Sequence, residues 1–436
     1  MKKISTLILF ILLFLISSSG YSQTINARFS TYFYTWQRLD SLAASGTETY
    51  TTHIRGYQNL LFDISGGKWS FNTFMQLDDD IMLVNKIGTG FGFRFYNMYV
   101  KGSNLFNVLD LKLGRQYISA GVGKGTTDGA YMKLKLGKNK EYQFIAYGGE
   151  LTPLTYEITK YQNIKNNYNL GGQFLYYGVK DLMVGLSYNS KNRKADPYYA
   201  LRSDSLYNTN SVLIETDSKA DQSAGLDFNY SLFNKHNFYG KAYYDLNRKI
   251  FVRGEFNTSI QANKNFRVSA GFNYREPQIS YNSIFWVFMH SQTKEIEGGI
   301  DYLYNDKLNF YTRLANVFYD GENSLKFQLG LTSSSYGLSF VKYSGYTGES
   351  DGFYGYLSNE LIKSKLILTS GLNYSSYKLT KYTDDRNNAF CGSLGFTYRP
   401  EPRISIDAQG QFITNSISKF DTRFLVGFNY WMFNKF

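Results

Sequence analysis

The sequence predicts an all-β fold: a transmembrane antiparallel up-and-down β-barrel of about 22 strands, with about 18 or 20 strands also compatible. Three observations lead to this prediction. Short segments of alternating apolar and polar residues recur along the chain, and tyrosine repeatedly ends their apolar face. Beyond the N-terminal segment, no apolar run approaches the roughly 20 residues that a membrane-spanning helix needs. In hydrocarbon, a closed barrel is the other structure that pairs every backbone N–H and C=O.

Residues 1–22 have the order of a secretory signal. Lys2 and Lys3 precede a continuous apolar run, and small and polar residues follow it up to Ser22. We expect cleavage after Ser22, so that residues 1–22 are a signal peptide and residues 23–436 form the barrel.

Alternation of residue type marks the expected strands. In "ISIDAQGQF", residues 404–412, the residues Ile, Ile, Ala, Gly and Phe alternate with Ser, Asp, Gln and Gln. Residues 182–188, 266–274 and 325–331 repeat this pattern. Each such strand of a membrane barrel has one face on lipid and the other on the lumen.

Tyrosines distinguish this pattern from that of a soluble β-sandwich, which also alternates. A sandwich hides its apolar faces in one core, whereas rings with a polar tip are favoured where strands cross the lipid headgroup boundary. Here tyrosine closes the apolar face of several segments, at Tyr188, Tyr230, Tyr274, Tyr398 and Tyr430. The pattern favours a membrane barrel.

The connections between strands are unequal. Short turns such as "SGGK", "GKNK" and "NDK" alternate with longer segments, of which residues 190–221 are the longest. An even number of strands with both termini in the periplasm explains this order. A barrel of about 22 strands normally holds a plug. Either loops fold inward, the strand count is lower, or a partner fills this role, and residues 190–221 are long enough to constrict the lumen.

The closing segment "LVGFNYWMFNKF" predicts the last strand, with Phe428, Tyr430 and Met432 on lipid and Phe436 at the end. It resembles the C-terminal assembly signal of Gram-negative outer-membrane proteins, although Asn434 stands where such signals often carry an apolar residue. The resemblance implies a location in the cell outer membrane and the barrel assembly machinery as a partner.

A second resemblance lies in residues 110–137. The pattern "LGRQ…DG", which contains Arg115 and Asp128, resembles the strand, glycine loop and strand of porin-like and alginate-export-like barrels. It implies passive passage of solutes. We expect a bulge at Gly114 that turns Arg115 inward and a flexible outer loop at Gly121 to Gly125. Arg115 and Asp128 are therefore candidates for a constriction, and the alternative is a loop with a polar rim.

The lumen face is predicted to carry charges of both signs, so the net charge of +12 does not by itself indicate an anion channel. The excess base falls in turns and loops, where it can meet lipopolysaccharide phosphates or water. Charges on consecutive strands either shape a transverse field or only brace the wall as ion pairs. The candidate lumen wall consists of Lys241, Arg253, Glu255, Arg267, Asp301, Arg313 and Lys326.

These features predict an outer-membrane porin-like channel for passive diffusion of small hydrophilic solutes. The rival is a non-conducting barrel that serves a surface or secretion complex through the loops at residues 190–221 and 276–293. The second of these loops contains the apolar run "IFWVFM". A transporter of apolar solutes is disfavoured because the predicted lumen face is mostly Asn, Ser, Gln and charged residues.

No enzyme activity, cofactor or metal site is expected. The three histidines, His53, His236 and His290, are far apart in sequence and in predicted height, so they form no triad or metal set. Nucleic-acid binding is disfavoured because the basic residues do not form one stripe.

Overall fold

The computed structural model describes most of the chain after residue 22. The described ranges are 23–40, 49–80, 92–158, 163–194, 197–203, 208–215, 220–278, 291–345, 348–379, 382, 384–416 and 419–436. The expected signal peptide, residues 1–22, lies outside them.

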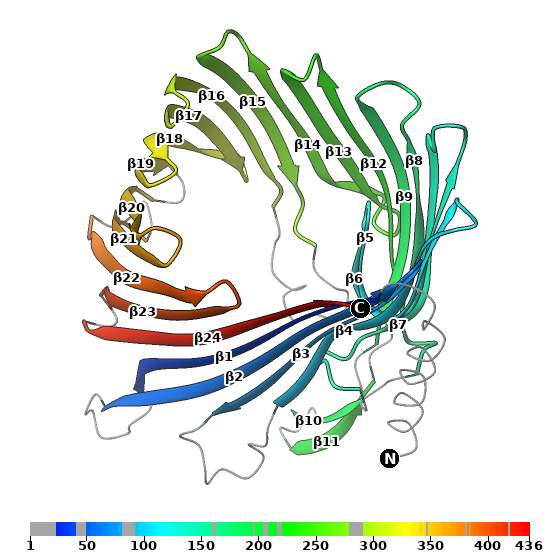
Figure 1. Cartoon of the computed structure of the whole chain (residues 1–436). Coiled ribbons are helices and arrows are strands. Elements are labelled where there is room, and N and C mark those ends of the chain that lie inside the picture. Colours follow the sequence, from blue (N-terminus) through cyan, green and yellow to red (C-terminus); the bar gives the residue numbers. More distant parts are fainter. Residues whose placement is uncertain are drawn as a thin grey trace.

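Within these ranges, 22 strands form one closed antiparallel sheet, as the sequence predicts (Figure 1). A further two strands, β10 (Tyr198–Ser203) and β11 (Thr209–Ile214), pair only with each other. The barrel strands are β1 (Gln23–Asp40), β2 (Thr49–Gly66), β3 (Trp69–Asp80), β4 (Gly92–Leu105), β5 (Leu109–Ala120), β6 (Gly123–Leu136), β7 (Tyr142–Leu151), β8 (Asn167–Tyr176), β9 (Leu182–Arg193), β12 (Asp221–Leu232), β13 (His236–Asp245), β14 (Ile250–Gln261), β15 (Phe266–Arg275), β16 (Thr293–Asn305), β17 (Leu308–Tyr319), β18 (Glu322–Ser333), β19 (Tyr336–Gly345), β20 (Ser350–Ile362), β21 (Leu366–Tyr377), β22 (Asn387–Glu401), β23 (Ile404–Thr414) and β24 (Asp421–Lys435).

The barrel closes between its first and last strands. β1 pairs with β24 from Thr24 opposite Lys435 to Trp36 opposite Arg423. At the end of this seam the N–H of Phe436 donates to the carbonyl of Gln23 over 2.9 Å, and the N–H of Gln23 donates back over 3.2 Å. The closing segment is therefore a full barrel strand, and the sheet has no free edge at this seam.

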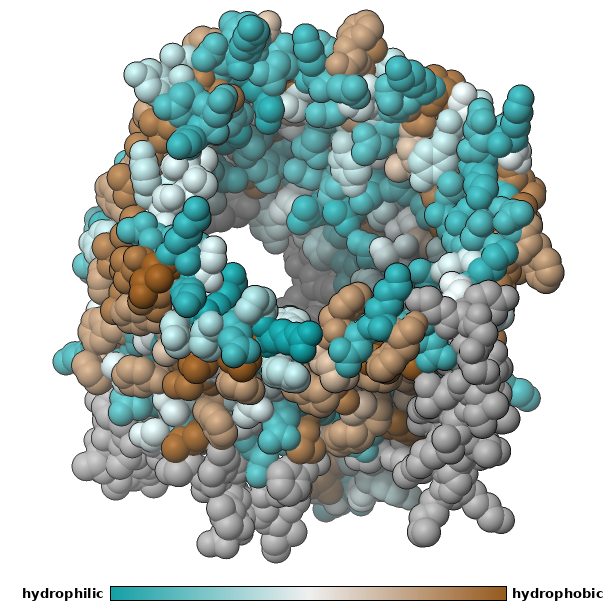
Figure 2. All heavy atoms as spheres, viewed as in Figure 1, coloured by the Kyte–Doolittle hydropathy of each residue, from teal (hydrophilic) through white to brown (hydrophobic). Residues whose placement is uncertain are grey.

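The strand register sorts side chains onto two faces, because residues opposite each other in a ladder point the same way. On the outer face, Leu186 is 54% exposed, Leu329 52% and Phe428 46%. Tyr430 and Met432 share the outer face of β24 with Phe428 by their spacing. Figure 2 shows hydrophobic atoms around the outside and hydrophilic atoms around a central opening. This arrangement is that of a barrel immersed in lipid.

Across the described ranges, we find no helix with the length and apolar character needed to cross a membrane.

Candidate functional site: the lumen and its inward hairpin

A passage runs through the centre of the ring in the space-filling view (Figure 2). The atoms around it are mainly hydrophilic. The barrel wall and one hairpin, β5–β6, position the side chains along this passage.

The β5–β6 hairpin bends into the barrel at a row of glycines. Gly114 has a φ of +122°, and a Cβ there would lie 2.4 Å from the carbonyl oxygen of Met98. Gly129 is its register partner on β6 and Gly149 is the next partner on β7. A Cβ on Gly149 would lie 2.6 Å from the Cα of Gly129. Only glycine lets the three backbones approach this closely, and the bend follows from it.

Beyond the bend, the hairpin lies against the inside of the wall. Ile118 and Ala120, each 1% exposed, pack with three lumen-facing residues of β7 and β8: Ile145, Tyr147 and Leu175. The opposite face of the hairpin is uncovered, with Tyr117 61% exposed. The tip therefore docks through an apolar cluster on the lumen side of the barrel.

Hydrogen bonds to three strands fix the hairpin. The N–H of Val122 donates to the hydroxyl of Ser187 on β9 over 3.1 Å, and the hydroxyl of Tyr243 on β13 donates to the carbonyl of Gly121 over 3.2 Å. Asn169 on β8 donates to the hydroxyl of Thr127 over 3.1 Å. The prediction of a flexible outer loop at Gly121 to Gly125 is wrong, because these residues form a tight hairpin end and the start of β6 held against the wall. Gly121, with a φ of +58°, supplies the turn conformation.

Arg115 holds the bend. Its side chain is 2% exposed and donates to both carboxylate oxygens of Asp128, over 2.7 Å and 2.9 Å. It also donates to the carbonyls of Phe95 at 3.0 Å, Tyr156 at 2.6 Å and Glu157 at 3.2 Å. The guanidinium thus joins β4, β6 and the connection after β7. The structure brings Arg115 and Asp128 together as an enclosed pair rather than as open lumen charges.

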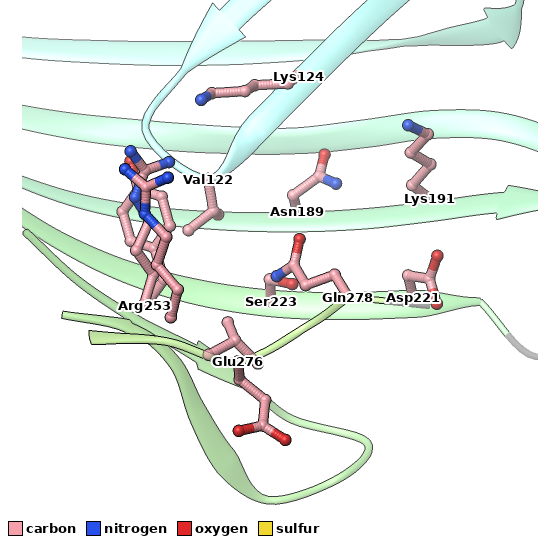
Figure 3. A pocket seen from close by; sticks show the side chains of 12 residues that line it. Val122, Lys124, Asn189, Lys191, Asp221, Ser223, Arg253, Glu276 and Gln278 are labelled. Atoms are coloured by element: carbon pink, nitrogen blue, oxygen red, sulfur yellow. The ribbon is translucent and has the colours of Figure 1, made fainter. Parts of the chain in front are cut away.

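A cavity of about 420 Å³ lies between the hairpin tip and the facing wall (Figure 3). Four basic and two acidic side chains line it, together with polar and apolar ones. The basic residues are Lys124, Lys191, Arg253 and Arg275, and the acidic ones are Asp221 and Glu276. The cavity therefore presents charges of both signs.

The side chains of the candidate lumen wall lie on β13 to β18, and most of their charges are paired. Arg253 contacts Glu255 at 2.5 Å, and Arg275 approaches the same carboxylate at 3.6 Å. Lys241 is the register partner of Glu255 and lies over the rings of Tyr239 and Tyr243, at 5.1 Å and 5.6 Å from their centroids.

The pairing continues along the wall. Arg313 donates to both oxygens of Asp301 at 2.8 Å, and Arg267 is the register partner of Asp301. Lys326 lies 3.4 Å from Glu297 and 3.8 Å from Glu295. Arg275 and Glu295 are members that the candidate wall omitted. Arg275 is two residues from Asn273 and Glu295 is two residues from Glu297, which places both on the lumen face. This spacing could have identified them from the sequence.

The described hairpin in the long connection at residues 190–221 does not form the expected constriction. Its described part contains the β10–β11 hairpin, which lies beside the ring and not in its opening (Figure 1). The run "IFWVFM" of the loop at residues 276–293 lies outside the described residues.

The two histidines within the described ranges lie on separate strands, β2 and β13. His53 stacks on Trp36 with ring centroids 5.0 Å apart, His236 begins β13, and His290 lies outside the described ranges. Among the residues that the structure covers, no group of three His, Cys, Asp or Glu side chains could hold a metal ion.

No protein-family model matches the sequence, and neither does any curated protein. Solved structures match its fold. A mutant of the ferric enterobactin receptor PfeA of Pseudomonas aeruginosa matches with a TM-score of 0.57 and 10% identity, over 94% of this chain and 80% of that chain.

Two further solved structures match with lower scores. OccAB3 of Acinetobacter baumannii has a TM-score of 0.42 at 10% identity, and OpdK of Pseudomonas aeruginosa has 0.42 at 8%. Each alignment covers 94% of this chain and 99% of the other. In fold, the described part of the chain is a closed 22-stranded antiparallel β-barrel, and the likeness to the PfeA structure is one of fold.

Proposed function

We propose that this barrel is an outer-membrane channel through which small hydrophilic solutes diffuse passively. The observation that carries the proposal is the hydrophilic passage through the ring (Figure 2). The β5–β6 hairpin narrows this passage from one side, and the charged wall on β13 to β18 faces it. Because the wall charges are mostly paired, they give the passage polarity with little net charge.

Recordings from the refolded protein in planar lipid bilayers test this proposal. Stable current steps are expected, together with a small reversal potential under a salt gradient. A variant in which residues 118–125 are replaced by an Asn-Gly turn between the register partners Tyr117 and Thr126 is expected to conduct more, because the hairpin tip no longer fills part of the lumen. A folded, heat-modifiable barrel that conducts no current would overturn the proposal.

A second function, as a surface scaffold, is favoured by one observation. The β10–β11 hairpin carries Tyr199 and Leu201 at 73% and 74% exposed. Exposed apolar side chains that pair with nothing in the barrel suit contact with another surface protein. In this role, deletion of residues 198–214 would release a co-purifying partner and leave conductance unchanged.

Assembly and location are part of the same proposal. The closing strand β24, which ends at Phe436, is proposed to be read by the barrel assembly machinery, and residues 1–22 to direct export. The basic turns and loops are proposed to lie against lipopolysaccharide phosphates.

A further inference from the structure

Three lysines lie on neighbouring strands of the lumen wall. They are located between the bend at Gly114 and the β4–β5 turn. Lys101 lies on β4, Lys112 on β5 and Lys133 on β6. Lys101 and Lys112 are direct register partners, so their side chains leave the sheet side by side on the same face. Lys112 and Tyr131 are also register partners, and Lys133 follows Tyr131 by two residues on the same face.

These lysines lack carboxylate partners of the kind that Arg253, Arg313 and Lys326 have. In the described part of the chain, none of the three lies within ion-pair distance of an acidic side chain. Asp110 is the register partner of Lys133, but its carboxylate contacts Lys135 at 2.5 Å and accepts the N–H of Asn104 at 2.8 Å.

Tyrosine rings flank the middle lysine. The Nζ of Lys112 lies 5.4 Å from the ring centroid of Tyr99 and 5.2 Å from that of Tyr131. All three lysines are half-buried. The rings limit the directions in which the ammonium can move, and each also carries a hydroxyl that can donate a hydrogen bond.

The arrangement is unfavourable without a ligand. Like charges placed directly opposite each other destabilise a strand pair, and the half-buried position weakens their screening by salt. An anion between Lys101 and Lys112 would turn this repulsion into two attractions. Asp63 on β2 is another carboxylate on this face: it is the register partner of Asn72 on β3, which is the register partner of Tyr99 on β4. One carboxylate beside three lysine ammonium groups leaves an excess of positive charge.

We infer that Lys101, Lys112 and Lys133 form a binding site for an anionic group of the phosphate or carboxylate type, carried by the permeating solute. This inference names a solute class for the proposed channel and in that respect rests on it. The site lies immediately past the constriction, so a solute that has passed the hairpin meets it next.

Calorimetric titration of the refolded protein in detergent tests the site without requiring a current. Inorganic phosphate and succinate are the two probes, and the tighter one identifies the preferred group. Lys112→Gln and Lys101→Gln are each expected to weaken binding roughly tenfold or more, because each removes a charge-assisted hydrogen bond. The matched control is Lys307→Gln, which makes the same charge change in an exposed turn between β16 and β17 and should bind as the wild type does.

A stability measurement separates binding from a structural role. Without added anion, Lys101→Gln and Lys112→Gln should unfold at the same or a higher urea concentration than the wild type, because a repulsion is removed. With phosphate, only the wild type and Lys307→Gln should gain stability.

Wild-type protein that binds neither anion, or a Lys112→Gln protein that binds like the wild type, would overturn the inference. A barrel that binds phosphate but conducts no current would keep the site and refute the channel. A barrel that conducts but binds neither anion would do the reverse.

Discussion

Replacement of Arg115 by alanine should destabilise the barrel and open its lumen. Breaking a buried ion pair by removing one partner typically costs about 3 to 5 kcal/mol, because the other charge stays enclosed. The side chain of Asp128 is 17% exposed, so water can reach part of its carboxylate. The lower end of this energy range therefore applies. Three backbone carbonyls also lose the guanidinium as a donor, although that of Tyr156 still accepts the N–H of Phe95 at 3.1 Å. We therefore expect the free energy of unfolding to fall by about 3 kcal/mol.

Urea unfolding in lipid vesicles, followed by tryptophan fluorescence, measures this loss. Arg115→Lys keeps the charge but not the two-pronged contact, so an intermediate loss is expected. The double variant Arg115→Gln/Asp128→Asn should lose less free energy of unfolding than the sum of the losses of Arg115→Gln and Asp128→Asn. The difference should be at least about 1 kcal/mol, because the two groups are in direct contact.

The functional consequence follows from the position of the pair. Arg115 ties the bend to β4 and to the connection after β7, so its loss should let the hairpin leave the wall. Planar-bilayer recordings of Arg115→Ala should then show a larger and noisier conductance than the wild type. An Arg115→Ala protein within about 0.5 kcal/mol of the wild type, with unchanged conductance, would refute the role given to this residue.

Three further predictions test the bend, the two faces and the seam. Gly114→Val should lower the folded yield on refolding and cost about 1 to 3 kcal/mol, because its positive φ and the carbonyl of Met98 exclude a Cβ, whereas Gly298→Ala, with no atom within 4 Å of its Cβ, should be nearly neutral. Leu372→Arg should cost about 2 kcal/mol in vesicles because it faces lipid, and Asn373→Arg, the next residue on the lumen face and the register partner of the uncharged Tyr354 and Cys391, less than about 1 kcal/mol. Deletion of Phe436 removes the backbone pairing with Gln23 and should slow barrel assembly, measured by the appearance of the heat-modifiable band; normal assembly kinetics would contradict this.

The strand pattern was predictable because a membrane barrel imposes a period of two on every strand. Residues 404–412 alternate in the sequence, and β23 spans Ile404–Thr414 in the structure. The same period places Arg253, Arg313 and Lys326 on one face, where the structure brings each beside a carboxylate. The period of two does not determine which rotamer a long side chain adopts or which neighbouring side chain it contacts.

A bulge at Gly114 was expected, but the docking of the β5–β6 hairpin against the wall beyond it could not be predicted from the local pattern. The glycines between Gly121 and Gly125 suit a flexible loop as well as a tight turn, and the sequence gives equal support to both. The choice depends on contacts far along the chain: Arg115 reaches the carbonyl of Tyr156, and Gly121 accepts from Tyr243, which is 122 residues away. Such contacts exist only once the barrel has formed.

One signal for the inward hairpin was nevertheless present in the sequence. Ile145 and Leu175 fall on the lumen face by their spacing, where they break the rule that this face is polar. Leaving such side chains in water forgoes the stabilisation that burial gives, at about 25 cal/mol per Å² of apolar surface. In the structure they are each 8% exposed beneath Ile118 and Ala120, which lie on the continuation of the lumen face of β5. An apolar patch on the wet face of a barrel therefore indicates where a segment folds in to cover it. Applied to β7 and β8, this reasoning places the constriction on the side of the lumen where the hairpin lies.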